Sequence, residues 1–132
     1  MKTKTTWLMA ATVAMAMGST ATANPRNVEY VTEGLIAAGM AVELGDYCGS
    51  VDVRLIRGLN FLQGLKRHLD DLGYTDAEIE QYIDNDVEKE RLEGIARQRL
   101  ADLGVRPGDS ASYCTVARAQ MAAGTQVGRL LR

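Results

Sequence analysis

The two cysteines of this chain are the residues with the clearest chemistry. Cys48 and Cys114 are the only cysteines among its 132 residues. In an exported protein of this size, two cysteines are typical of a structural disulfide. The compartment outside the cytoplasm is oxidising, and a covalent link stabilises a domain that has only a small core. The alternative is a reactive thiol pair, but the two have no C-x-x-C spacing and no neighbouring histidine to lower a thiol pKa. We therefore expect Cys48 and Cys114 to form a disulfide, which requires the fold to bring their α-carbons within about 7 Å.

The only histidine, His68, is the candidate for general acid–base chemistry. A general base needs a substrate pocket and an orienting partner, whereas His68 stands between Arg67 and Asp70 in a charged helical segment. No G-x-S-x-G elbow supplies a serine nucleophile. One histidine is also too few for a typical transition-metal site when both thiols are committed elsewhere. The sequence therefore predicts no catalytic residue, no metal site and no cofactor site.

Acidic residues cluster in the second half of the chain. The run from Asp84 to Glu88 superficially resembles a calcium-binding loop, but the sixth position is Lys89 instead of glycine and the twelfth is Ile95 instead of glutamate. A pair of carboxylates could serve as acid and base, and the candidates are Glu88, Glu90 and Glu93. Basic residues alternate with these acids, which is typical of solvated charge on a helix surface with some pairing between successive turns.

Four arginines are candidates for binding an anion. They would form one surface if the last two long helices brought them together, although arginine on an exposed helix face is the ordinary case. The four are Arg91, Arg97, Arg99 and Arg118.

The start of the chain has the three parts of a signal peptide. Lys2 and Lys4 form a positive region, residues 7–17 are apolar, and Ala21 and Ala23 are small residues of the kind that a signal peptidase accepts. A membrane anchor is the alternative, but an apolar run of about eleven residues is well short of the ~20 needed to span a bilayer. We therefore expect cleavage after residue 23, a periplasmic or secreted location, and no stable membrane insertion of the product.

Residues 24–132 have the size of one domain. Without Lys2 and Lys4, 13 Lys and Arg stand against 17 Asp and Glu, a formal net charge of about −4. Because binding to nucleic acid or to an anionic membrane needs clustered positive charge, this mild acidity favours neither partner.

Apolar residues recur at helical spacing throughout this domain, which predicts an all-α fold, a small bundle of about five helices. The clearest stripe is a leucine every three or four residues from Leu55 to Leu72, and this segment is interpreted as the central helix. Thr75 and Glu78 have the spacing of a capping box. The expected helices cover residues 24–47, 52–72, 75–83, 87–103 and 110–123, and a short tail with Val127, Leu130 and Leu131 follows. Whether this tail docks on the core stays open.

Five segments carry a resemblance to a known family. They are Tyr47-Cys48, residues 72–79, residues 84–91, residues 112–114 and residues 124–131. In these segments the chain resembles a family of small secreted helical proteins of unknown function from Rhodobacter-like alphaproteobacteria, and the resemblance extends over nearly all of residues 24–132. It implies an exported helical domain with this cysteine pair, and it implies no activity.

Two roles are compatible with these features. The lack of a catalytic constellation favours a protein-interaction module that presents a helical surface to another cell-envelope protein. The alternative is an acid- or stress-protective periplasmic chaperone, which would expose apolar helices when its carboxylates become protonated. An enzyme would need a pocket that the sequence does not indicate, and we expect the protein not to be one.

Overall fold

We describe the protein from a computed structural model, in which residues 24–132 are placed; the signal peptide expected over residues 1–23 lies outside the described residues. The described part is helical and has no strand beyond one isolated bridge. A short 3-10 turn, η1 (Pro25–Asn27), precedes six helices: α1 (Glu29–Tyr47), α2 (Leu55–Asp71), α3 (Asp76–Ile83), α4 (Asp86–Asp102), α5 (Ser110–Ala123) and α6 (Gln126–Arg129). The all-α prediction is confirmed, and α6 is an addition to the five expected helices.

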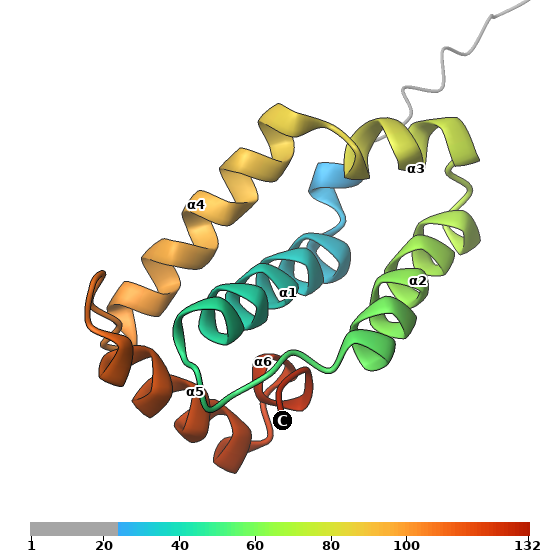
Figure 1. Cartoon of the computed structure of the whole chain (residues 1–132). Coiled ribbons are helices and arrows are strands. Elements are labelled where there is room, and N and C mark those ends of the chain that lie inside the picture. Colours follow the sequence, from blue (N-terminus) through green and yellow to red (C-terminus); the bar gives the residue numbers. More distant parts are fainter. Residues whose placement is uncertain (1–23) are drawn as a thin grey trace, which may run out of the picture.

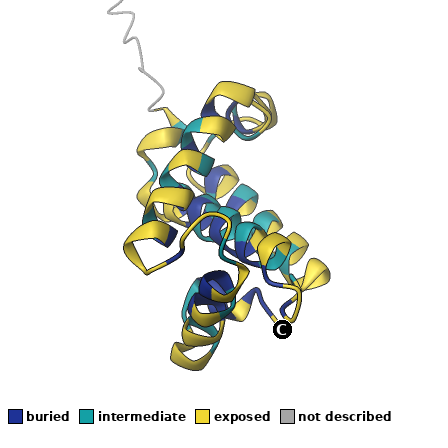
Figure 2. Ribbon diagram, turned by 60° about the vertical axis from the view of Figure 1, so that its left-hand side comes forward, coloured by how far each residue is buried: buried dark blue, intermediate teal, exposed yellow. Residues whose placement is uncertain are grey.

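The first long helix, α1, lies at the centre of the fold. It packs against α2, α4, α5 and α6, and Figure 1 shows it between α2 on one side and α4 on the other. Its buried residues are Val31, Gly34, Ile36, Met40, Ala41 and Leu44. Many of its side chains are small, so several helices can pack closely around it. Figure 2 shows buried residues along this helix and exposed ones on the outer sides of its neighbours.

The leucine-rich helix α2 lies on a flank, so its interpretation as the central helix was wrong. Of its six-leucine stripe only Leu65 and Leu69 are buried. These two side chains join Val31, Ile79 and Tyr82 in a small core beneath α3. Leu62 is partly buried against the same core, whereas Leu55 and Leu59 at the start of α2 and Leu72 at its end are exposed. The periodic spacing of the leucines identified the helix correctly, but it did not show how much of the apolar face is covered by another element.

Two helix starts also differ from the prediction. At the beginning of the domain, Val28 has an extended conformation, which separates η1 from α1. The second helix begins at Leu55 instead of Asp52 because the preceding residues pair with the end of the chain. The backbone N–H groups of Asp52 and Arg54 donate to the carbonyl oxygens of Arg132 and Leu130, at N···O distances of 2.9 and 2.8 Å.

The expected cap residues are confirmed. Glu78 N–H donates to the Thr75 hydroxyl at 3.2 Å, and Thr75 N–H donates to the Glu78 carboxylate at 2.8 Å, which completes the capping box. At the starts of α4 and α5, the side chains of Asn85 and Asp109 each accept the backbone N–H of the residue three positions later, without the reciprocal contact. At the end of α5, Gly124 has φ 64°, the left-handed conformation that glycine adopts most easily. These caps mark the starts of α3, α4 and α5 and the end of α5.

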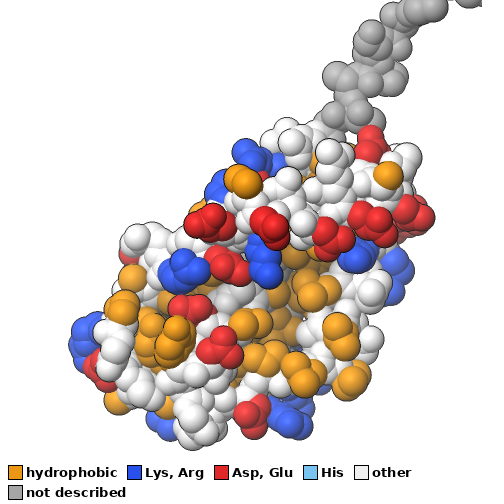
Figure 3. All heavy atoms as spheres, turned by 45° about the horizontal axis from the view of Figure 1, so that its top comes forward, with side chains coloured by type: hydrophobic (Ala, Val, Ile, Leu, Met, Phe, Trp, Pro, Cys, Tyr) orange, Lys and Arg blue, Asp and Glu red, His pale blue; other side chains and the backbone are white. Residues whose placement is uncertain are grey.

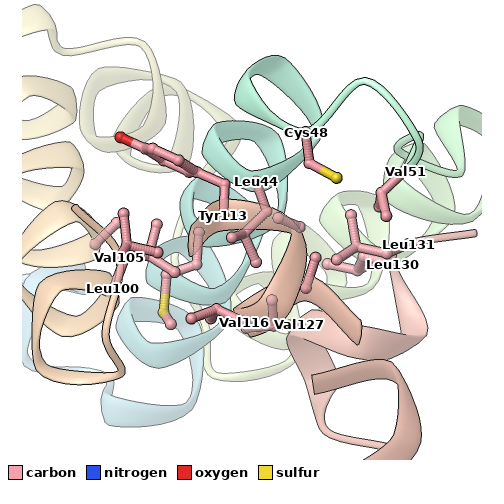
Figure 4. Close-up of a cluster of buried hydrophobic side chains, with 14 of the residues drawn as sticks. Leu44, Cys48, Val51, Leu100, Val105, Tyr113, Val116, Val127, Leu130 and Leu131 are labelled. Atoms are coloured by element: carbon pink, nitrogen blue, oxygen red, sulfur yellow. The ribbon is translucent and has the colours of Figure 1, made fainter. Parts of the chain in front are cut away.

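The tail docks on the main core. Val127, Leu130 and Leu131 are all buried, and Figure 4 shows them with Leu44 and Val51 in one cluster. An isolated bridge between Val53 and Leu131 adds backbone pairing. Cys48, Leu100, Val105, Tyr113 and Val116 belong to the same cluster and are also labelled in Figure 4. The last residues of the chain are therefore part of the folded domain.

Candidate functional site

The cysteine pair is a structural link in this fold. Cys48 follows the last residue of α1 and Cys114 lies in α5; their sulfur atoms are 2.05 Å apart and their α-carbons 5.0 Å apart. Cys48 is completely buried, and the described residues include no free cysteine. The predicted pairing is thus present, and it ties the central helix to the helix that carries the C-terminal segment.

The histidine does not meet a catalytic partner in the described fold. The ring of His68 in α2 packs against Tyr30 at the start of α1, with ring centroids 4.7 Å apart and planes tilted by 55°. An aromatic pair at this separation contributes packing energy. His68 thus helps to hold α2 beside α1.

The four candidate arginines do not converge on one surface. Arg91, Arg97 and Arg99 all lie in α4, whereas Arg118 lies in α5. Arg99 forms a two-pronged ion pair with Glu33 of α1, with N···O distances of 2.6 and 2.8 Å. This guanidinium lowers the pKa of the Glu33 carboxyl. Arg97 contacts Glu93 at 3.3 Å, and Arg118 donates to the Ser50 hydroxyl at 3.1 Å. Each group therefore has a separate partner, which leaves no shared anion site among them.

Glu88 corrects the interpretation of the acidic run as solvated surface charge. Only 5% of this residue is exposed, because its carboxylate lies between the guanidinium groups of Arg91 and Arg26. Arg91 Nε donates to Glu88 Oε1 at 3.0 Å, and Arg26 Nε donates to the same oxygen at 3.2 Å. The hydrogen bond from Arg91, opposed by burial and assisted by Arg26, lowers the pKa of Glu88. A carboxylate held in its ionised form this way is suited to joining η1 to α4, and it is poorly suited to accepting a proton.

Asn85, in the same run, has a structural role at a helix start. Asn85 accepts the N–H of Glu88 at 2.9 Å and so caps α4. Within residues 24–132, no three His, Cys, Asp or Glu side chains are grouped as metal ligands would be. None of the described helices combines the length and the apolar character needed to cross a bilayer.

An apolar groove lies along α1 and is the strongest candidate for a binding site. Helices α2 and α4 pack on the two flanks of α1, as Figure 1 shows, and side chains of these three helices and of α3 line the groove. The groove has a volume of about 550 Å³, and its apolar lining includes Leu35, Ala38, Val42, Leu62, Ile83 and Leu92. Val42, in the floor, is 48% exposed. Figure 3 shows a face on which hydrophobic side chains gather below a row of acidic ones.

Charged side chains border this groove. They are Glu43, Asp46, Lys89 and Glu93. Arg97 contacts two of them, with its Nε 3.8 Å from Glu43 and its terminal nitrogen 3.3 Å from Glu93. Asp46 lies in the last turn of α1, which contains no basic residue. The border is therefore most acidic beside the C-terminal end of α1.

Sequence reasoning missed this groove because it assigned one buried face to each helix. The signal was present in α1, where apolar or small residues surround much of the helix. Ile36 and Leu44 are buried in the core, Leu35 packs partly against the core while it also lines the groove, and Val42 is largely open. A helix that is apolar on most sides requires neighbours on most sides. Within the described part of the chain, α1 has an apolar stripe that is only partly covered.

Comparison with known proteins assigns the chain to a family. No curated protein and no solved structure matches it. The profile of a family of unknown function, DUF5333, matches residues 24–132, which is the whole described region. The chain therefore belongs to DUF5333, a family of unknown function.

Proposed function

We propose that residues 24–132 form an exported, periplasmic or secreted, interaction module that binds an amphipathic helix of another cell-envelope protein in the groove along α1. The leader-like residues 1–23 and the cysteine pair support export. The observation that carries the proposed binding role is the open apolar stripe of α1. The role is one of protein contact and involves no catalysis.

The shape of the stripe favours a helix as the occupant. Leu35, Ala38 and Val42 are spaced by three and four residues and line the same groove. Such a row forms a ridge on a helix surface, and a second helix packs against ridges of this kind at an interaxial distance of about 8–10 Å. Ala38 is small, so the backbone of a partner helix can approach closely at this point of the groove. A bound helix would then lie along α1 between α2 and α4 and add one helix to the bundle.

The charge of the border favours a basic residue near one end of this partner. Glu43 and Glu93 share Arg97, whereas Asp46 has no such contact among the described residues. The C-terminal end of α1, where Asp46 lies, also has the negative end of the helix dipole. A lysine or arginine beside an apolar stripe would complement this end of the groove.

The test compares two substitutions at equally exposed positions. Val42 in the groove and Leu103 after α4, outside it, are both 48% exposed. Tagged wild-type, Val42→Asp and Leu103→Asp proteins are expressed in the native cell and captured from the envelope fraction, and captured proteins are identified by mass spectrometry. Circular dichroism verifies that each variant is folded.

We expect one stoichiometric companion with the wild type and with Leu103→Asp, and its loss with Val42→Asp. A synthetic peptide with the amphipathic helix of that companion should then bind wild type in a titration and fail to bind Val42→Asp. A companion that Val42→Asp retains, or a peptide that binds both proteins equally, would refute the groove as its site. Capture of many unrelated proteins, together with binding of a hydrophobic dye below about pH 4, would instead indicate the acid-protective chaperone.

Export has a separate test. N-terminal sequencing of the protein from the periplasmic or culture fraction should begin at Asn24. A protein that stays in the cytoplasmic fraction with an intact Met1 would contradict export without bearing on the groove.

A further inference from the structure

A second apolar surface lies at the start of α2 and shares no lining residue with the groove along α1. Leu55 and Ile56 are each 73% exposed and Leu59 is 59% exposed. Exposed leucines are common singly, but three large apolar side chains within five residues form a patch that normally has a partner. These three residues are here called the α2 patch.

Arginines surround the α2 patch. Arg54, Arg57 and Arg132 line one open hollow together with Leu55 and Ile56. Among residues 24–132, no Asp or Glu oxygen lies within 4.0 Å of the charged nitrogens of these three arginines. By contrast, each of five other arginines contacts a carboxylate: Arg26, Arg91, Arg97, Arg99 and Arg106. The guanidinium groups at the α2 patch are therefore available to an external anion.

The fold itself gathers these charges. Arg132 is 75 positions or more from the others in sequence and reaches them through the bridge between Val53 and Leu131. The same contact includes hydrogen bonds between the backbones of Asp52 and Arg132, with N···O distances of 2.9 Å in both directions. Arg57 also donates to the carbonyl oxygen of Arg129 at 3.3 Å. From residue 54 to residue 69 the sequence has no acidic residue, although the whole domain is acidic.

We propose that the α2 patch attaches the protein peripherally to a membrane surface that contains anionic phospholipid. Apolar side chains that project from one face of a helix, with cationic side chains beside them, are typical of helices that lie at the headgroup boundary of a membrane. Arginine can keep its charged head among phosphates while its stem lies along apolar surface. Because the rest of the domain carries net negative charge, electrostatic repulsion turns the remaining surface away from the bilayer and leaves this end to approach it. The attachment is superficial, and no helix crosses the bilayer.

The proposal goes beyond the binding role of the α1 groove and rests on a different surface. The test uses the chain from Asn24 onward, since the apolar run of the leader would itself partition into lipid. Binding to vesicles of phosphatidylglycerol and phosphatidylcholine in equal parts is measured by co-sedimentation, next to vesicles of phosphatidylcholine alone. The variants are Ile56→Ser and Arg57→Glu, and the matched control is Leu72→Ser, which alters a leucine that is 55% exposed just beyond the other end of α2.

We expect the wild type and Leu72→Ser to bind the anionic vesicles and to be released by added salt. Ile56→Ser and Arg57→Glu should each weaken the partition coefficient by about tenfold, because one loses apolar contact and the other reverses a charge. A wild type that stays in the supernatant with anionic vesicles would overturn the proposal and would leave an acidic protein segment as the partner to examine. Equal binding of wild type, Ile56→Ser and Leu72→Ser would overturn it as well. Val42→Asp should bind vesicles normally, so a failure of the groove and a failure of the patch are distinguishable.

Discussion

The packing of α6 on α5 can be tested with one added methyl group. A β-carbon built on Gly128 would lie 2.0 Å from the carbonyl oxygen of Gln120, 2.4 Å from its carbonyl carbon and 2.7 Å from the backbone nitrogen of Met121. All three are backbone atoms, which cannot turn aside as a flexible side chain can. Gly128→Ala should therefore force α6 away from α5.

The expected cost follows from what α6 holds in place. Inserting a methyl group into well-packed structure typically costs about 1–3 kcal/mol. Displacement of α6 would also expose part of Val127, Leu130 and Leu131, all buried in the native fold, and full burial of one such side chain is worth about 1.5–3 kcal/mol. We expect Gly128→Ala to lower the free energy of unfolding by about 3–5 kcal/mol, a large part of the roughly 5–15 kcal/mol of a small domain.

The assay is equilibrium urea unfolding followed by far-UV circular dichroism, with Gly94→Ala as the matched control. Gly94 lies within α4, and a β-carbon there would meet no atom within 4 Å. Because alanine is the better helix former, this control should raise the free energy of unfolding by about 0.5–1 kcal/mol. If Gly128→Ala unfolds within about 0.5 kcal/mol of wild type, the range typical of neutral surface changes, the close approach of α6 to α5 is refuted.

Three further changes test other contacts. Glu88→Gln should lower the free energy of unfolding by about 1–3 kcal/mol at neutral pH. Since the pKa of Glu88 is lowered in the native state, this difference should persist above the pKa of the unfolded chain and vanish as the pH falls through the native pKa. A difference between the two urea curves that does not change with pH would contradict the ion pair. The double substitution Cys48→Ser and Cys114→Ser should cost about 2–4 kcal/mol, measured as a lower thermal midpoint than that of the oxidised protein; equal midpoints would show that the link does not stabilise the fold. Thr75→Ala removes the hydroxyl that caps α3 and should cost about 1 kcal/mol, whereas Thr75→Ser should cost much less; equal losses in urea unfolding would exclude the cap as the cause.

Several elements could be predicted from the sequence because they depend on residues close together in the chain. Thr75 and Glu78 are three positions apart, and the cap that they form needs only the local backbone. The positive φ of Gly124 likewise follows from the preference of glycine at a helix end. The all-α fold could be predicted for the same reason, since a 3.6-residue period of apolar residues is visible within a single segment of the sequence.

Other features depended on distances across the fold. Glu88 was interpreted as solvated because its neighbours in sequence are charged, yet Arg26, 62 positions earlier, covers it from η1. The leucines of α2 have the same pattern at both ends of the helix, but only Leu65 and Leu69 are buried. A periodic pattern reports that a face is apolar and contains no information on which part of that face another element reaches.

By itself, the sequence therefore determined the type of the elements, most of their ends and the identity of the cysteine pair. The tertiary structure alone decided that α1 is central, that the tail docks, and that the arginines near Leu55 gather without acidic partners. The physical reason is the range of the interactions: capping and helix propensity act within a few residues, whereas burial and charge pairing depend on which distant segments the packed chain brings together.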